Sequence, residues 1–471
     1  METLCQIKNL LTRHKLCDHC LGRQFAMLGT GMSNISRGRM LRSTALLDAH
    51  RVIKEINEDT ENEHLDVNKS FVLKQLSDGY PLAVKISRQL NIISDDEFSA
   101  LQDNFNASYE IPDCEICSGI FTAKVKQGMS SATVEKQGSI EYSNYLVGSR
   151  INPRILENEE EMRVKFQLKW GESFKSHFNR FIGRELGKVL DKPVEFKNPD
   201  VVFMYIVTSG DDFSVEIQIN PYFIYGKYKK LIRGIPQTHW PHRPCNGRGC
   251  EECDFSGKQY KESVEEFISG PALRHFLGDA MKFHGAGRED IDARMLGDGR
   301  PFVIEILNGK KRRINLKELE KEINDLAGGK IEVSDLRAST KAEMQTIKVD
   351  SANVRKRYRA LCSLEAPLSD EMLETIKSTL EGTMIKQRTP ERVAHRRADK
   401  VRTKEVHEFI WERLEGGENQ QKIYLIIEAE GGTYIKELIS SDNGRTNPSV
   451  TGIAGQQVTC IELDVLEVSS G

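Results

Sequence analysis

Two pairs of cysteines have the spacing of zinc ligands. Cys17 and Cys20 form one Cys-x-x-Cys pair, and Cys114 and Cys117 form an identical pair much later in the chain. Such pairs from separate segments can supply four thiolates to one tetrahedral zinc ion, which leaves no coordination position for water. We therefore expect a structural zinc that locks the N-terminal segment to the following domain, with four unrelated buried cysteines as the alternative.

A second cluster of candidate ligands contains His242, Cys245, Cys250 and Cys253 among several glycines. These residue types suit another zinc ion, and the fourth ligand is open between His242, His239 and none. A glycine-rich loop that contacts RNA is an alternative explanation of the same residues. The sequence therefore predicts one zinc ion per chain and leaves a second one open.

The segment Gly285–Phe302 is a candidate for catalytic chemistry. It mixes glycines and carboxylates with arginines, Arg288 among them, directly before an apolar run. Such a loop can seat a carboxylate beside arginines. Judged by residue types alone, a salt-bridged surface loop is the favoured interpretation.

Two basic runs indicate a polyanionic partner, although the formal net charge of the chain is -3. The first, residues 221–249, contains no acidic residue, and its cations alternate with aromatic rings. These cations are Lys227, Lys229, Lys230, Arg233, Arg243 and Arg248. The second run, residues 386–402, has seven cations against Glu391 and Asp399. Cations beside flat rings suit phosphates and unstacked bases, so RNA is the expected partner, with a solvated helix face as the alternative for either run.

The domain organisation follows from length and periodicity. A chain of 471 residues is too long for one ordinary core, so it should divide into two or three domains. Residues 1–130 are expected to be helical and to bind zinc, and residues 131–240 to form an α/β domain. Residues 241–258 are expected to form a Cys-rich linker, and residues 259–471 a mixed domain with a largely antiparallel sheet. The expected fold class is α+β.

Individual elements follow from the spacing of apolar residues. The expected strands are Val164–Leu168, Val201–Val207, Phe213–Ile219, Val303–Leu307, Tyr424–Ala429 and Gln457–Val468. The expected helices are Phe174–Leu190, Leu316–Leu326 and Lys400–Leu414.

The location is expected to be cytoplasmic. No run of about 18 apolar residues occurs, and no apolar run near Met1 resembles a signal peptide. We therefore expect no membrane contact, and nothing indicates an obligate protein partner.

Three motifs, in order, are similar to those of pseudouridine synthases: Gly-Arg-x-Asp at residues 287–290, a Tyr-bearing strand at 356–360 and Gly-Thr-Tyr-Ile-Lys at 432–436. Residues 226–241 and 387–399, with the first two Cys pairs, extend the likeness over nearly the whole chain. The sequence resembles the archaeal and eukaryotic tRNA pseudouridine synthase family that modifies uridines 54 and 55 of the T arm. Within the α/β domain, the segment from Gly183 to Asp200 resembles the THUMP domain of tRNA-modifying enzymes. One departure is His242, which stands where a cysteine is expected.

The resemblance implies an isomerase that flips a uridine of tRNA into a pocket, detaches the uracil and rejoins it through carbon. It implies that Asp290 is the catalytic carboxylate, Tyr358 stacks on the uracil, Lys436 pairs with Asp290 and Ile453 walls the pocket. Asp292 is the rival carboxylate, because on a strand-like backbone it faces the same way as Asp290. The candidate contacts to RNA are Arg288, Lys227, Lys230 and Arg233. Zinc is then a structural metal, and no organic cofactor is needed.

Two other functions fit parts of the sequence. A non-catalytic, zinc-containing tRNA-binding protein would use the same cations and rings. A THUMP-type RNA methyltransferase would need a glycine-rich cofactor loop after a strand, and no convincing one is found.

Overall fold

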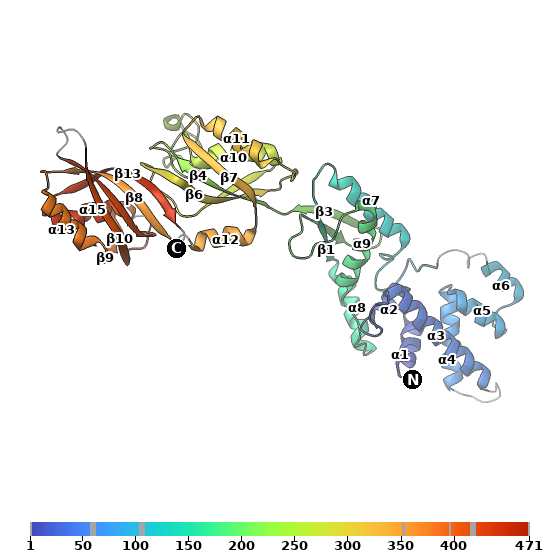
Figure 1. Cartoon of the computed structure of the whole chain (residues 1–471). Coiled ribbons are helices and arrows are strands. Elements are labelled where there is room, and N and C mark those ends of the chain that lie inside the picture. The colour runs from blue at the N-terminus through green and yellow to red at the C-terminus, as the bar shows by residue number, and fades with distance from the viewer. Residues whose placement is uncertain are drawn as a thin grey trace. The chain divides into compact units, whose positions relative to one another are not determined.

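The computed structural model describes residues 2–56, 63–102, 109–350, 354–394, 397–414 and 421–469. The chain divides into two compact units, Met1–Asn220 and Pro221–Gly471 (Figure 1). The boundary lies earlier than residue 240, where we expected it, because the strand Tyr222–Lys230 pairs within the sheet of the second unit. Within the described ranges, no helix is long and apolar enough to cross a membrane.

The first unit begins with helices and ends in a small sheet. Its helices are α1 (Glu2–Arg13), α2 (Asp18–Arg23), α3 (Asn34–Glu55), α4 (Glu63–Ser77), α5 (Pro81–Gln89), α6 (Asp95–Gln102), α7 (Ala123–Gln137), α8 (Pro153–Lys165) and α9 (Phe174–Leu190). The side chains of Ser33, Thr122 and Ser173 cap α3, α7 and α9, as short hydroxyl residues do at helix N-termini. The apolar faces of the helices and of the sheet form one continuous core.

The sheet of the first unit has three strands, β1 (Tyr145–Ile151), β2 (Val201–Val207) and β3 (Phe213–Ile219). β1 pairs with β2 in parallel and β2 with β3 antiparallel. The predicted strands β2 and β3 and the predicted helix α9 are confirmed. The predicted strand Val164–Leu168 is wrong, because its first residues complete α8, whose buried Ile155 and Met162 have helical spacing.

The second unit is built on one large sheet. Its strands are β4 (Tyr222–Lys230), β5 (Ala280–Gly285), β6 (Ala293–Leu307), β7 (Ile331–Ser339), β8 (Arg355–Leu364), β9 (Thr383–Arg388), β10 (Val401–Arg413), β11 (Lys422–Glu430), β12 (Thr446–Asn447) and β13 (Val458–Ser469). The strand order is β12-β9-β10-β11-β8-β13-β6-β4-β7, and β5 pairs with β6. All described pairs are antiparallel except β13 with β6, so the largely antiparallel α+β fold that we expected is confirmed.

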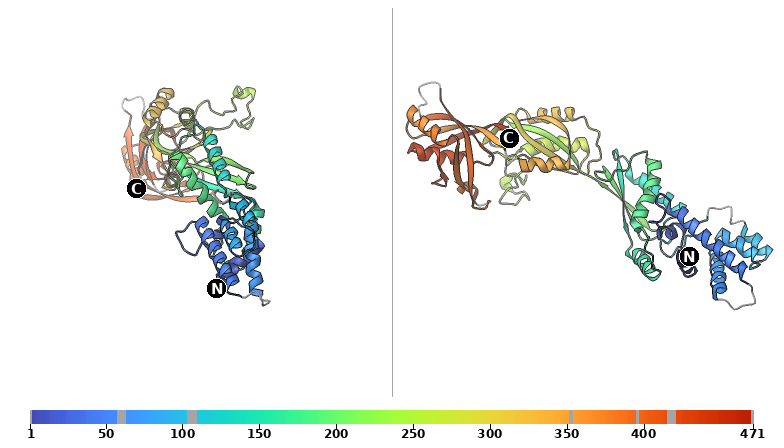
Figure 2. Two further views of the ribbon diagram at one scale, coloured as in Figure 1. Left: turned by 90° about the vertical axis from the view of Figure 1, so that its right-hand side faces the viewer. Right: turned by 60° about the horizontal axis from the view of Figure 1, so that its bottom comes forward.

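Two apolar cores lie along this sheet. The described helices of the unit are α10 (Val264–Phe276), α11 (Leu316–Ala327), α12 (Lys341–Asp350), α13 (Asp370–Leu380), α14 (Glu391–Ala394), α15 (Ile435–Ser440) and α16 (Val450–Ala454). α10 and α11 pack on β4, β6 and β7, which Figure 2 shows from two further directions. α13 and α15 pack on the strands around β8 and β11. β13 and β6 join the two regions of the sheet.

Strand β10 corrects the predicted helix Lys400–Leu414. Its buried residues Val406 and Phe409 are three apart, which is a helical spacing. A register shift between Val406 and Glu408 causes this spacing, because an extra residue in one strand offsets the alternation of inward and outward side chains.

Candidate active site and metal centres

The Gly-Arg-Glu-Asp motif forms the loop between β5 and β6. The ammonium of Lys230, a fully buried residue of β4, donates hydrogen bonds to the carbonyls of Asp290 at 3.0 Å, Ile291 at 3.1 Å and Ile235 at 2.9 Å. Gly287 adopts a φ of +79, and a Cβ there would lie 3.2 Å from a guanidinium nitrogen of Arg300. The loop therefore requires glycine at position 287. The hydrogen bonds of Lys230 to the carbonyls of Asp290 and Ile291 hold the loop in place.

Glu289 lies buried beneath this loop. It accepts a hydrogen bond from Arg300 Nε at 2.9 Å and from the Tyr228 hydroxyl at 2.9 Å. Gln237 donates to Tyr228 and to the carbonyl of Gly287. The observed partners of the Glu289 carboxylate are all buried side chains, so Glu289 stabilises the loop.

Asp290 is held by an arginine that sequence reasoning did not pair with it. The two terminal nitrogens of Arg392, in α14, each lie 3.1 Å from an oxygen of Asp290. Arg392 Nε also donates to Glu437 at 2.6 Å, and Glu437 has a side chain only 6% exposed. Burial alone would lower the pKa of Arg392, but the two carboxylates outweigh burial and raise this pKa. Arg392 thus orients Asp290 while it is anchored on α15.

Lys436 lies between the two candidate carboxylates. Its ammonium is 3.7 Å from Asp290 Oδ2 and donates a hydrogen bond of 2.6 Å to Asp292. The side chain of Asp292 is 64% exposed and does not line the cavity beside Asp290. Of the two carboxylates, Asp290 is therefore the one that lines the cavity.

A cavity of about 340 Å³ opens beside Asp290, where β6, β8 and β13 meet. Its volume is near the lower end of the usual range for ligand pockets, about 300–1,000 Å³. Tyr358 on β8 lies in the wall, and burial raises the pKa of its hydroxyl to about 12. The apolar wall comes from Leu463 and Val465 on β13. Ile453, which we expected there, is half-buried in α16 and does not line the cavity.

The residues that line this cavity carry more positive than negative charge. The cations are Arg288, Arg300, Lys356, Arg392, Arg397 and Lys436, and the acids are Glu289 and Asp290. Arg288 lies over the ring of Trp240, 5.5 Å from its centroid. Arg397 donates to the hydroxyl of Tyr434. From the sequence, Arg392 and Arg397 were recognised only as members of the second basic run, and their place beside Asp290 was not predicted. His395 and Arg396 of that run lie outside the described residues.

The first basic run is largely neutralised by neighbouring strands. Lys227 lies 3.4 Å from Asp335, and Lys229 pairs with Glu332; both acids are on β7. Arg233 binds Glu462 and Asp464 and the carbonyl of Leu463 on β13. Lys230 is fully buried, so these four cations stabilise the sheet and the loop between β5 and β6, whereas RNA contacts were expected of Lys227, Lys230 and Arg233.

The first set of cysteines fits a metal ion. The sulfurs of Cys17, Cys20, Cys114 and Cys117 all lie within 4.8 Å of one another, and those of Cys17 and Cys117 are 3.7 Å apart. A tetrahedral zinc with Zn–S bonds of about 2.3 Å requires sulfurs about 3.8 Å apart. All four cysteines are buried, so this set could hold a structural metal.

The second set includes His242 as its fourth member. His242 Nδ1 lies 3.5 Å from the sulfurs of both Cys245 and Cys250, and the Cys253 sulfur is 3.7 Å from that of Cys250. The backbone N–H groups of Gly249, Cys250 and Gly257 donate to these sulfurs, as expected for thiolate ligands. His239 instead faces Glu266. This set, too, could hold a metal.

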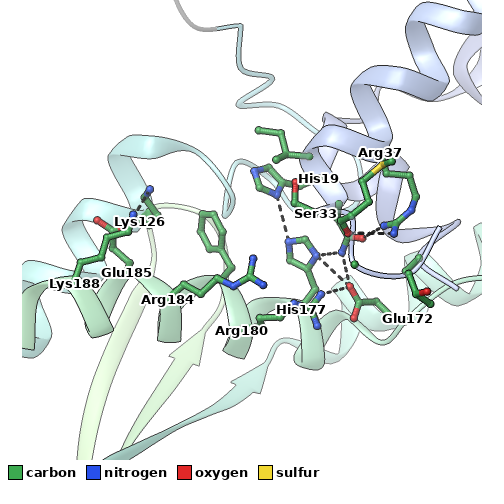
Figure 3. A pocket seen from close by; sticks show the side chains of 17 residues that line it. His19, Ser33, Arg37, Lys126, Glu172, His177, Arg180, Arg184, Glu185 and Lys188 are labelled. Atoms are coloured by element: carbon green, nitrogen blue, oxygen red, sulfur yellow. Dashed lines mark hydrogen bonds and ion pairs between the residues drawn. The ribbon is translucent and has the colours of Figure 1, made fainter. Parts of the chain in front are cut away.

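The first unit has a cavity of its own, of about 610 Å³, between α3 and α9 (Figure 3). His19 and His177 face each other in its wall. Its cations are Arg37, Lys126, Arg180, Arg184 and Lys188, against the acids Glu172 and Glu185. Arg180 pairs with Glu172 and Lys126 with Glu185, so the remaining charge is positive.

The chain is similar to known proteins along most of its length. A sequence model of the family described as "Pus10, C-terminal" matches residues 223–469, and one described as "Pus10 THUMP domain, archaeal" matches residues 130–205. The tRNA pseudouridine synthase Pus10 of Methanothrix thermoacetophila is 38% identical over 96% of this chain and 91% of its own. Those of Methanocaldococcus jannaschii and Methanopyrus kandleri are 38% and 36% identical over 98% of this chain, and over 93% and 97% of their own.

The fold and these matches define a chain with a THUMP domain followed by a pseudouridine synthase domain. The chain belongs to the Pus10 family.

Proposed function

We propose that this protein isomerises uridine 54, uridine 55 or both in the T arm of tRNA to pseudouridine, in the cytoplasm, with Asp290 as the catalytic carboxylate. The observation that carries the proposal is the place of Asp290 on the wall of a cavity. Arg392 holds it at 3.1 Å, and Lys436 and Tyr358 line the same cavity. The named activity of the Pus10 relatives supports the same reaction.

The cavity supplies what the reaction requires. A uridine of a folded arm must be flipped out of its stack, and Tyr358 offers it a ring, while Leu463 and Val465 offer an apolar wall. Asp290 serves as the nucleophile or as the base that starts detachment of the uracil. Arg392 and Lys436 orient its carboxylate through their contacts of 3.1 Å and 3.7 Å.

The tRNA backbone would be held by cations outside the reacting centre. Arg288 and Arg397 are exposed beside the Asp290 cavity. In the first unit, the excess of cations around the larger cavity, with the ring of Phe181 in its wall, suits phosphates and an unpaired base. We propose that this cavity is part of the surface with which the THUMP-containing unit binds tRNA.

Zinc would act in folding only. At the first site four cysteines leave no position for a substrate, and at the second site His242 and three cysteines fill a tetrahedron. When bound, zinc ties α2 to the turn at Cys114–Cys117 in the first unit and closes the 242–253 loop in the second.

The test compares Asp290→Asn with Asp292→Asn, the neighbouring exposed carboxylate that shares Lys436. Each variant is incubated in excess over an unmodified tRNA transcript, and pseudouridine is mapped under single-turnover conditions. Asp290→Asn should abolish the reaction and keep tRNA affinity, because only the charge of one carboxylate is lost. Asp292→Asn should keep most of the rate.

An active Asp290→Asn, or an inactive Asp292→Asn, would overturn the assignment of the carboxylate. A wild-type protein that binds tRNA but forms no pseudouridine in any transcript would replace the enzyme with a zinc-containing tRNA-binding protein.

A further inference from the structure

One lysine on the wall of the Asp290 cavity has no ion-pair partner among the described residues. Lys356 lies on β8 two residues before Tyr358, so the two side chains project from the same face of the strand. Lys356 is only 7% exposed and lines the cavity. Among the residues that the structure describes, no carboxylate oxygen lies within 4.0 Å of its ammonium, and no group accepts a hydrogen bond from it.

The two acids of the cavity are already engaged by other cations. Glu289 is bound by Arg300, and Asp290 by Arg392. Burying an ammonium ion without a partner is unfavourable unless a ligand supplies the missing acceptor. Lys356 is therefore an unsatisfied donor in a cavity that receives a substrate.

The electrostatic surroundings agree with this geometry. Arg300 on β6 and Lys404 on β10 both repel the charge of Lys356. Glu289, in the loop before β6, attracts it. Burial, followed by Arg300, lowers the pKa of Lys356 to about 8. The lysine is mostly charged at neutral pH and loses its proton at mildly alkaline pH.

We propose that Lys356 is a further catalytic residue, whose ammonium donates a hydrogen bond to a carbonyl oxygen of the flipped uracil and stabilises the charge that develops there. This inference rests on the proposed pseudouridine synthesis. When the C1′–N1 bond breaks, its electron pair leaves with the uracil and spreads onto the ring oxygens. The new C1′–C5 bond then uses an electron pair of the ring, the C5 proton is released, and N1 takes up a proton.

The burial of Lys356 favours the base over a phosphate as its partner. The phosphates of a flipped nucleotide stay with the RNA backbone at the mouth of the cavity, where Arg288 and Arg397 are exposed. The base enters furthest, towards Tyr358, which is as buried as Lys356. A donor beside that ring can reach the oxygens of the uracil.

The experiment uses the whole chain of 471 residues, purified without chelator, and an unmodified tRNA transcript. Lys356→Met removes the charge at similar length, and Lys282→Met is the matched control, because Lys282 on β5 pairs with Glu305 outside the cavity. We expect Lys356→Met to lower the single-turnover rate about 100-fold, the usual effect of removing one donor to a developing anion. Its tRNA affinity should be unchanged, and Lys282→Met should react like the wild type.

A pH profile separates this role from a structural one. The wild-type rate should fall above about pH 8, where Lys356 loses its proton, and Lys356→Arg should keep its rate at alkaline pH because arginine stays charged. This comparison also decides the matter if Lys356→Met does not fold.

Three results would overturn the inference: a Lys356→Met rate near that of the wild type, a defect of Lys356→Met confined to tRNA affinity, or identical alkaline profiles for wild type and Lys356→Arg. The second would assign Lys356 to a phosphate. A wild-type protein with no pseudouridine synthesis at all would instead refute the proposed function on which the inference rests.

Discussion

Arg392 offers the sharpest test of how the carboxylate is positioned. Arg392→Gln removes two charge-assisted contacts of 3.1 Å to Asp290 and one of 2.6 Å to Glu437. A hydrogen bond to a charged group contributes roughly 1.5–3 kcal/mol. The side chains of Arg392 and Asp290 are about one third exposed, which places their pair near the lower end, about 1.5–2 kcal/mol.

That free energy corresponds to a rate about 10–30-fold lower under single-turnover conditions. The reaction should not be abolished, because Lys436 stays near Asp290. Arg388→Gln is the matched control, since Arg388 lies four residues earlier and pairs with the exposed Asp399. Its rate should stay near that of the wild type.

Arg392→Gln also leaves the buried Glu437 without its arginine, which should lower the melting temperature. The double variant Arg392→Gln with Glu437→Gln separates the two effects, because it removes the orphaned charge as well. We expect it to regain stability but not rate. A double variant that regains the rate, or an Arg392→Gln protein as fast as the wild type, would refute the reasoning that Arg392 orients Asp290.

The remaining predictions concern the metal centres and the first unit. Cys114→Ser should lose about one equivalent of zinc by metal analysis and lower the melting temperature of the first unit. Cys5→Ser, at an exposed cysteine, should change neither the zinc content nor the melting temperature. If the second set of ligands also binds zinc, Cys250→Ser should likewise lose one equivalent, with a smaller loss of stability. An unchanged zinc content in Cys250→Ser would refute the second zinc site. Arg184→Glu should weaken tRNA binding and reduce the slope of log K against log salt concentration by roughly one unit. Arg154→Glu, at an exposed position of α8, is the control and should have neither effect. Equal effects of the two variants would show that the cavity does not bind tRNA.

Much of the fold could be predicted from local periodicity. The bounds of α9, β2 and β3 match the predicted runs, because each element has one apolar face with regular spacing. Strand β10 could not be recognised, because its bulge produces a helix-like spacing of buried residues. A bulge depends on the partner strand, and the sequence does not show which strand that is.

Pairing between distant segments explains what sequence reasoning missed at the site. The run from Pro221 to Gly249 contains no acid, yet Asp335 and Glu332 come to it from β7 by strand pairing. Arg392 was recognised only as one of several cations, because its partner Asp290 lies about a hundred residues earlier. Leu463 has no motif of its own, and only the position of β13 brings it into the cavity.

The two candidate metal sites differ in how soon a growing chain can complete them. His242 to Cys253 spans one short loop, so its four ligands leave the ribosome almost together. Cys17 and Cys117 are 100 residues apart, and the earlier pair must wait until α1–α6 have been synthesised. Cross-linking a loop of about 100 residues removes conformational entropy worth about 4.7 kcal/mol from the unfolded chain. A metal at the first site would thus be captured only about midway through the synthesis of this unit, which runs to Asn220, and it would link helices already made.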